Sequence, residues 1–91
     1  MSHKKKVDTI MDRKEILKQL NDIFVNALDN EDLIISESDQ AGDVEGWDSL
    51  THIMLVVSIE KHFKIKFTST EILSWQNVGE MIDSISAKIE Y

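Results

Sequence analysis

The sequence predicts an all-α fold, a small four-helix bundle with three long helices and one short helix. Its 91 residues suffice for one domain with a single core. There is no proline, and the three glycines at positions 42, 46 and 79 lie outside the stretches of helical spacing or at their edges. Because proline and glycine interrupt regular structure most strongly, this distribution favours uninterrupted helices.

The first helix is expected to begin after Asp12, which can cap it, with Glu15 three residues later reaching back as in a capping box. Asp29 and Asn30 end the pattern. Apolar residues recur between these limits at steps of three and four and form one stripe: Ile16, Leu17, Leu20, Ile23, Phe24, Ala27 and Leu28.

The connection over residues 30–48 is long for a small domain, and such loops are usually functional or contain short helical turns. Leu33, Ile34 and Ile35 are expected to pin it onto the core. Eight acidic residues and no Lys or Arg lie from Asp29 to Asp48. Two compatible interpretations are open: the charges keep a solvated loop soluble, or they form a docking surface that steers a basic partner towards Ser49. We assign Asp43 and Glu45 to a candidate partner surface.

The second helix should run from Ser49 to about His62. Its apolar run has strand-like propensity, but the breaker-free stretch over 49–67 is too long for a typical strand. At 100° per residue, Leu55, Val56, Ile59 and Phe63 share one side, which we assign to the core. The opposite side is also apolar and is the candidate partner surface: Leu50, Ile53, Met54 and Val57.

Two further helices complete the bundle. Ser69 and Thr70 open a short helical turn that contains residues 71–73 and extends towards Trp75. Asn77 then caps the last helix, with Glu80 at its third position. The inner stripe of that helix comprises Val78, Met81, Ile82, Ile85 and Ile89.

Residues 1–11 form an expected flexible basic tail, either a leader or an expression remnant, with Met11 as an alternative native start; the domain spans 12–91. The net charge of −7 argues against binding to nucleic acid. No apolar run has membrane-spanning length, no secretory signal is present, and the absence of cysteine excludes disulfides and thiolate metal sites. We therefore expect a cytoplasmic protein with no membrane contact.

No metal site is expected. An EF-hand started at Asp39 would place Val44 where glycine is needed and Leu50 at position twelve, so that reading fails. His52 and His62 lie about 80° apart around one helix and make a poor metal pair. Ordinary surface or edge-of-core histidines are the better interpretation. Trp47 and Trp75 are interpreted as loop aromatics that cover the core.

Ser49, in the stretch Gly46-Trp47-Asp48-Ser49-Leu50, is the main candidate functional residue. It has no visible base and no Gly-x-Ser-x-Gly context, so a hydrolase is not indicated. The residue reads as a hydroxyl that is modified, with a simple helix cap as the alternative.

With these elements in place, the chain resembles the acyl carrier proteins of the phosphopantetheine-binding family over roughly residues 12–90. The resemblance rests on five stretches: Asp48-Ser49-Leu50, the helix through Glu60-Lys61-His62-Phe63, the exit over 63–67, Thr70-Glu71-Ile72-Leu73, and Asn77-Val78-Gly79-Glu80. The combination is far more specific than Asp-Ser-Leu alone.

The resemblance implies a non-catalytic carrier on which a phosphopantetheinyl transferase attaches 4′-phosphopantetheine to Ser49. Acyl groups are then held as thioesters on the arm. Asp48 would assist Mg²⁺-dependent loading, with the metal belonging to the transferase complex. Further implied partners are acyl-transferring and ketosynthase-type enzymes of fatty-acid, polyketide-like or lipid-modifying systems, and we expect a monomer.

The sequence also departs from its commonest relatives. Fatty-acid carriers usually have an acidic second helix, whereas this chain has Thr51 and Met54 at places where acids are usual. We infer a partner interface that depends more on apolar contact than on salt bridges, and hence a specialised pathway. An aminoacyl or peptidyl carrier is the first alternative, disfavoured by Asp48 before the serine. A helical adaptor without cofactor is the second.

Overall fold

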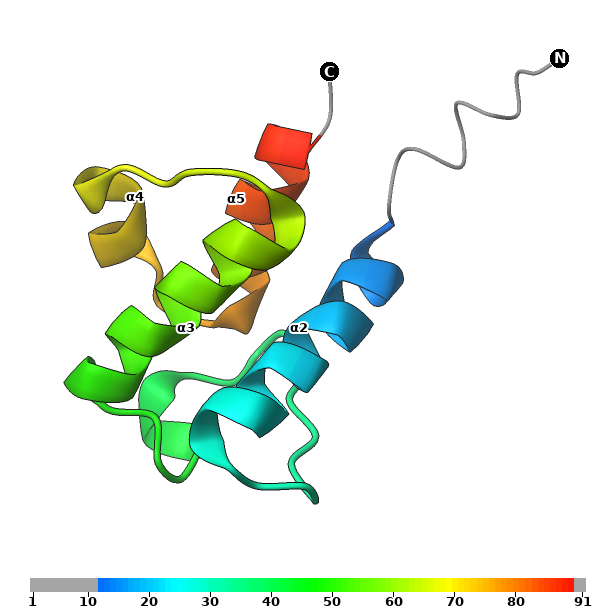
Figure 1. Ribbon diagram of the computed structural model, residues 1–91, viewed down its shortest axis with the longest axis vertical. Coiled ribbons are helices and arrows are strands. Elements are labelled where there is room, and N and C mark those ends of the chain that lie inside the picture. Colours follow the sequence, from blue (N-terminus) through cyan, green and yellow to red (C-terminus); the bar gives the residue numbers. More distant parts are fainter. Residues whose placement is uncertain (1–11, 90–91) are drawn as a thin grey trace, which may run out of the picture.

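The computed structural model describes residues 12–89. Its α-helices are α2 (Arg13–Leu28), α3 (Ser49–Phe63), α4 (Ser69–Ser74) and α5 (Val78–Ile89), with a short 3-10 turn, η1 (Ala41–Asp43), in the long connection (Figure 1). Over this range there is no strand, which confirms the all-α prediction of three long helices and one short one. The expected basic tail over residues 1–11 lies outside the described residues.

A side-chain cap marks the start of α2, and a left-handed backbone cap marks its end. The Asp12 carboxylate accepts a hydrogen bond from the Glu15 N–H at 2.9 Å, as expected. The expected capping box is not formed, because the Glu15 carboxylate accepts a bond from the Gln19 side chain, one turn onward, and does not reach back to the Asp12 N–H. At the other end Asp29 adopts a left-handed conformation with φ of 53°, which closes the helix where the apolar pattern stops.

The short helix α4 is capped by Thr68, one residue before the expected opening pair. Thr68 Oγ1 accepts from the Glu71 N–H, and the Glu71 carboxylate accepts from the Thr68 N–H, a complete capping box. The bond from the Thr68 N–H lowers the pKa of Glu71, with a smaller contribution from Lys88. Trp75 lies just outside α4, as its C-terminal cap.

The last helix, α5, follows the prediction with one change. The Asn77 side chain accepts from the Glu80 N–H at 2.9 Å, as expected of a cap. The Glu80 carboxylate, however, accepts from the N–H of Gln76, one residue earlier than a standard capping box requires.

The hydrophobic core lies where α2 packs against α3 and α5. Every residue assigned to the inner stripe of α5 is buried, except for Ile89, which is partly buried. Three side chains of the long connection also belong to this core: Ile35, Val44 and Trp47. The buried residues are Ile16, Leu20, Ile23, Phe24, Ile35, Val44, Trp47, Leu55, Val56, Ile59, Val78, Met81, Ile82 and Ile85.

The expectation that Leu33, Ile34 and Ile35 all pin the connection is wrong for Ile34. Ile35 is buried and Leu33 packs against the core, but Ile34 is 86% exposed. The segment is extended, so neighbouring side chains point to opposite sides. Asn21 fixes this arrangement, because its side chain donates to the Leu33 carbonyl and accepts from the Ile35 N–H at 2.7 Å.

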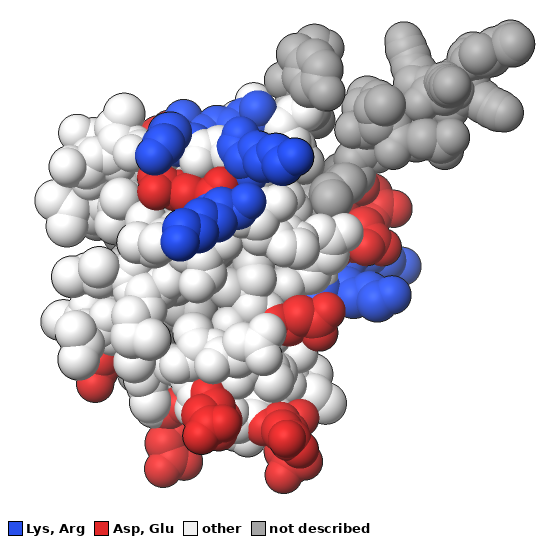
Figure 2. All heavy atoms as spheres, in the orientation of Figure 1, with Lys and Arg blue, Asp and Glu red and all other residues white. Residues whose placement is uncertain are grey.

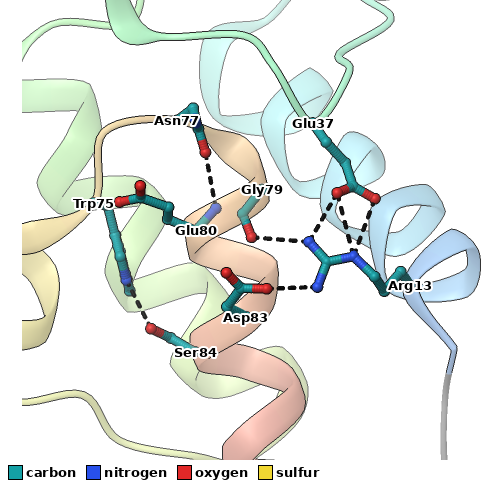
Figure 3. A network of polar contacts seen from close by, with 8 residues as sticks. All are labelled: Arg13, Glu37, Trp75, Asn77, Gly79, Glu80, Asp83 and Ser84. Carbon is teal, nitrogen blue, oxygen red and sulfur yellow. Dashed lines mark hydrogen bonds and ion pairs between the residues drawn. The ribbon is translucent and has the colours of Figure 1, made fainter.

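A charged network ties α2 to the connection and to α5 (Figure 3). Arg13 pairs with the carboxylates of Glu37 and Asp83 and donates to the Gly79 carbonyl. Gly79 also donates its N–H to the Glu37 carbonyl at 2.8 Å. A Cβ on Gly79 would lie only 3.1 Å from that oxygen, so the close approach of the two backbones favours glycine here.

Candidate functional site

Ser49 is the first residue of α3 and is exposed. Its hydroxyl forms no hydrogen bond to any residue between 12 and 89. The helix cap is Asp48, which makes the interpretation of Ser49 as a cap wrong. The Ser49 side chain is thus exposed to solvent, and within the described residues its hydroxyl stabilises no part of the fold by a hydrogen bond.

Asp48 is held rigidly by a reciprocal pair of bonds with Thr51. Its carboxylate accepts from the Thr51 N–H at 2.9 Å, and its own N–H donates to Thr51 Oγ1 at 2.8 Å. Thr51 in turn donates to the carbonyl of Gly46, whose φ of 90° favours glycine. The backbone hydrogen bond from Thr51 is the main reason that the pKa of Asp48 is lowered, so the group is a carboxylate at neutral pH.

Trp47, His52 and Trp75 form an aromatic cluster beside Ser49. Trp47 is buried against Phe24, edge to face, and donates its indole N–H to His52 Nδ1 at 3.1 Å. The His52 ring stacks on Trp47, and the edge of Trp75 completes the group. Trp75 is fixed in turn by a bond from its indole to Ser84 on α5 (Figure 3).

The two tryptophans therefore cover the core, as expected, and His52 is a half-buried edge-of-core residue. Burial lowers the pKa of His52. The contact between Trp47 and His52 was not predicted from the sequence. Its one available signal was the position of His52 three residues after Ser49, which puts both on neighbouring parts of the helix surface.

A pocket of about 500 Å³ opens next to the Ser49 hydroxyl. It lies between the start of α3 and the α4 segment, and its volume falls within the usual range for small-molecule sites. The lining is mainly apolar, with polar residues at the start of α3 and in the connection before α5. Its principal residues are Ser49, His52, Ile72, Leu73, Trp75 and Asn77.

The outer side of α3 is an exposed apolar face. Leu50, Ile53, Met54 and Val57 are 44–70% exposed, whereas Leu55 and Ile59 on the opposite side are fully buried. The two-sided pattern read from the sequence is thus confirmed. This outer face begins immediately after Ser49 and runs along the helix.

Charge is distributed unevenly around this face (Figure 2). Acidic side chains gather at the end of the molecule formed by the connection before α3, and lysines gather where α3 ends. Asp43 and Glu45, from the expected acidic surface, are exposed. Lys61, Lys64 and Lys66 are also exposed and line one hollow together with Val57.

Within residues 12–89, no cluster of side chains has the composition needed to hold a metal ion. Over the same residues, no helix combines the length and the apolar content that a bilayer crossing needs.

The chain is similar to known carriers in sequence and in structure. Residues 18–85 match the family model described as a phosphopantetheine attachment site. The fold is similar to the solution NMR structure of a holo acyl carrier protein from Geobacter metallireducens, with a TM-score of 0.76 and 37% identity. That match covers 80% of this chain and 84% of the other.

Proteins of this family serve phosphopantetheinyl transferases and biosynthetic enzymes as partners, and they are not themselves catalysts. The covalent cofactor supplies the reactive thiol, which accords with a chain that contains no cysteine. From the match over most of its length and the likeness to a holo carrier, this chain belongs to the phosphopantetheine-binding family of acyl carrier proteins.

Proposed function

We propose that Ser49 is the residue to which 4′-phosphopantetheine is attached. The proposal rests on the state of the Ser49 hydroxyl, which is exposed and forms no hydrogen bond within the described residues. Ser49 also begins the helix that bears the exposed apolar face. An adjoining pocket of about 500 Å³ offers room for an arm attached there.

Attachment is a phosphoryl transfer. The Ser49 oxygen forms a bond to the phosphorus that bears pantetheine in coenzyme A, the bond from that phosphorus to the leaving 3′,5′-ADP breaks, and the hydroxyl proton passes to a base of the transferase. When bound, the arm supplies a terminal thiol that holds acyl groups as thioesters. The phosphodiester is anionic and gains roughly 0.3–1 kcal/mol from the α3 N-terminus at an exposed site.

Asp48 is the proposed carboxylate that assists Mg²⁺ during loading. Its lowered pKa keeps it ionised, and Thr51 fixes its orientation beside Ser49. The metal belongs to the complex with the transferase. Asp48→Asn tests the role: it retains an oxygen that can cap α3 but removes the charge. We expect slower loading, which higher Mg²⁺ concentrations partly restore.

Intact-mass spectrometry tests the attachment site. The chain is incubated with coenzyme A, Mg²⁺ and a phosphopantetheinyl transferase, and one phosphopantetheinyl group is expected to be added. Ser49→Ala should abolish this gain. Ser69→Ala is the matched control, because Ser69 is the exposed first residue of α4 after its own cap. A gain that persists in Ser49→Ala would refute the assignment.

The second proposal concerns the partners. We infer that acyl-transferring or ketosynthase-type enzymes contact Leu50, Ile53, Met54 and Val57, because this face is apolar, exposed and adjacent to Ser49. Contacts of this kind favour a specialised polyketide-like, lipid-modifying or sugar-acylating pathway over bulk fatty-acid synthesis. Equal, efficient use of the chain by a housekeeping fatty-acid ketosynthase and by a pathway-specific one would contradict this inference.

Asp43 and Glu45 are proposed to steer basic partners towards Ser49. Both are exposed residues of the connection before α3, and acidic side chains gather at that end of the molecule (Figure 2). Asp43→Asn with Glu45→Gln should lower the loading rate at low ionic strength and weaken its dependence on salt. An unchanged salt dependence would argue against steering. We further propose that the carrier is a cytoplasmic monomer, which sedimentation equilibrium and cell fractionation can check.

A further inference from the structure

His52 has one ring nitrogen that the fold uses and one that it leaves available. The indole of Trp47 can only donate, so His52 Nδ1 must be the acceptor in their 3.1 Å bond. In the neutral ring the proton therefore sits on Nε2. Among residues 12–89, no group accepts a hydrogen bond from this second nitrogen.

The ring is also held in a fixed orientation. Trp47 stacks on it at a centroid separation of 6.1 Å, and Trp75 meets it edge to face at the same separation. Trp47 is itself buried against Phe24, and Trp75 is anchored to Ser84. The available Nε2–H thus belongs to an imidazole whose tautomer and position are both set by the core.

This imidazole lines the pocket that begins at Ser49. His52 lies three residues after Ser49 on α3, so the two side chains are neighbours, with Cβ atoms about 5–6 Å apart. The remaining wall is mainly apolar, with Ile72, Leu73 and Trp75, although the polar residues Asp48, Gln76 and Asn77 also line it. In such a wall the Nε2–H can donate a hydrogen bond to any ligand that brings an acceptor atom, such as an oxygen.

We propose that His52 is a positioning residue for the cofactor arm: its Nε2–H donates a hydrogen bond to an oxygen in the phosphate-proximal part of the arm and holds that part against the pocket. This inference rests on the proposed attachment at Ser49. The two nitrogens of the His52 ring then have different roles: Nδ1 accepts a hydrogen bond from Trp47, and Nε2–H donates one to the arm.

Nuclear magnetic resonance on apo and holo protein labelled with ¹⁵N tests the proposal. Holo protein is prepared with coenzyme A, and its mass is checked first. In both forms Nε2 of His52 should be the protonated nitrogen. On loading, the Nε2 resonance should shift and its proton should become protected from exchange. Nuclear Overhauser contacts should appear between the arm and the rings of His52 and Trp75.

Substitutions then separate the donor from the structural bond. His52→Asn places an amide oxygen near the former Nδ1 and can still accept from Trp47, but it lacks the distal N–H. The contacts between arm and Trp75 should be lost in this variant and recovered in His52→Gln, whose longer amide restores a donor. His62→Asn is the control, because His62 is exposed on the same helix and bonds to Gln19; it should change nothing.

Each failure has its own signature. No mass gain on Ser49 would overturn the attachment site and this inference together. A loaded protein in which His52 Nε2 does not respond, or in which His52→Asn retains every arm contact, would overturn the inference alone. Should His52→Asn fail to fold, the comparison of apo and holo wild-type protein decides, since it requires no substitution.

Discussion

The two sides of α3 have nearly the same composition and opposite environments. Leu55, Val56 and Ile59 are buried against the rest of the bundle, while Leu50, Ile53 and Met54 on the other side are exposed to solvent. Both sides are aliphatic, so residue type does not distinguish them. What distinguishes them is the presence of α2 on one side only within the described chain. The inner side stabilises the fold, and the outer side is available for binding.

Truncating one leucine on each side gives the sharpest contrast. Leu55→Ala removes a fully buried side chain and should lower the free energy of unfolding by about 2–5 kcal/mol. Leu50→Ala removes a side chain that is 70% exposed and should change it by less than about 0.5 kcal/mol. Urea denaturation followed by circular dichroism measures both. Similar losses in the two variants would break the comparison.

The same pair should reverse its ranking in a binding assay. Leu50→Ala is expected to reduce kcat/KM for a partner that docks on the outer face by about tenfold, which corresponds to about 1.4 kcal/mol. Loading by a phosphopantetheinyl transferase provides a first measurement. Ile34→Ala is a suitable control, because Ile34 is an exposed isoleucine on the connection, outside this face. An equal effect of Ile34→Ala would indicate nonspecific contact.

A pH titration probes the amino-terminal end of the inner side, where the half-buried His52 precedes the apolar residues Leu55, Val56 and Ile59. Burial lowers the pKa of His52, so the folded state binds a proton less readily than the unfolded state does. Its contribution to stability is present above the unfolded pKa of about 6.5 and is lost as the pH falls towards the folded value. Unfolding free energies should therefore decrease between pH 7.5 and 5.5. His52→Asn should flatten this decrease.

The smallest expected effect is that of Ser49→Ala on stability. Asp48, and not Ser49, caps α3, so the change in the free energy of unfolding should stay within about 0.5 kcal/mol. A thermal melt displaced by tens of degrees would show that the hydroxyl has a structural role. The melt also serves as the fold control for the loading assay.

The limits of the four helices could be predicted because their signals are local. Apolar spacing located the helices, and the caps Asp12 and Asn77 located two of the starts. The reciprocal pair of Asp48 and Thr51 was missed, because sequence rules look for Glu or Gln at the third position and not for a hydroxyl.

The features that could not be predicted are those that depend on the path of an extended segment or on contacts between distant parts of the chain. Ile34 has the same residue type as Ile35, and only the direction of the chain at Asn21 separates them. The contact between Trp47 and His52 needs the loop to fold back onto α3, and the pairing of Arg13 with Glu37 and Asp83 joins three distant segments. Of the site itself, Ser49 and the outer face of α3 could be proposed from the sequence, but the pocket could not.

The reciprocal caps at Asp48 and Thr68 have a consequence for how the chain acquires its structure. Each cap joins residues only three positions apart, so the start of each helix is specified before distant parts of the chain meet. Domains whose contacts are mostly local fold within microseconds to milliseconds. A chain released from denaturant should consequently regain its native state within the dead time of manual mixing, with no slow phase from proline isomerisation, since it has no proline.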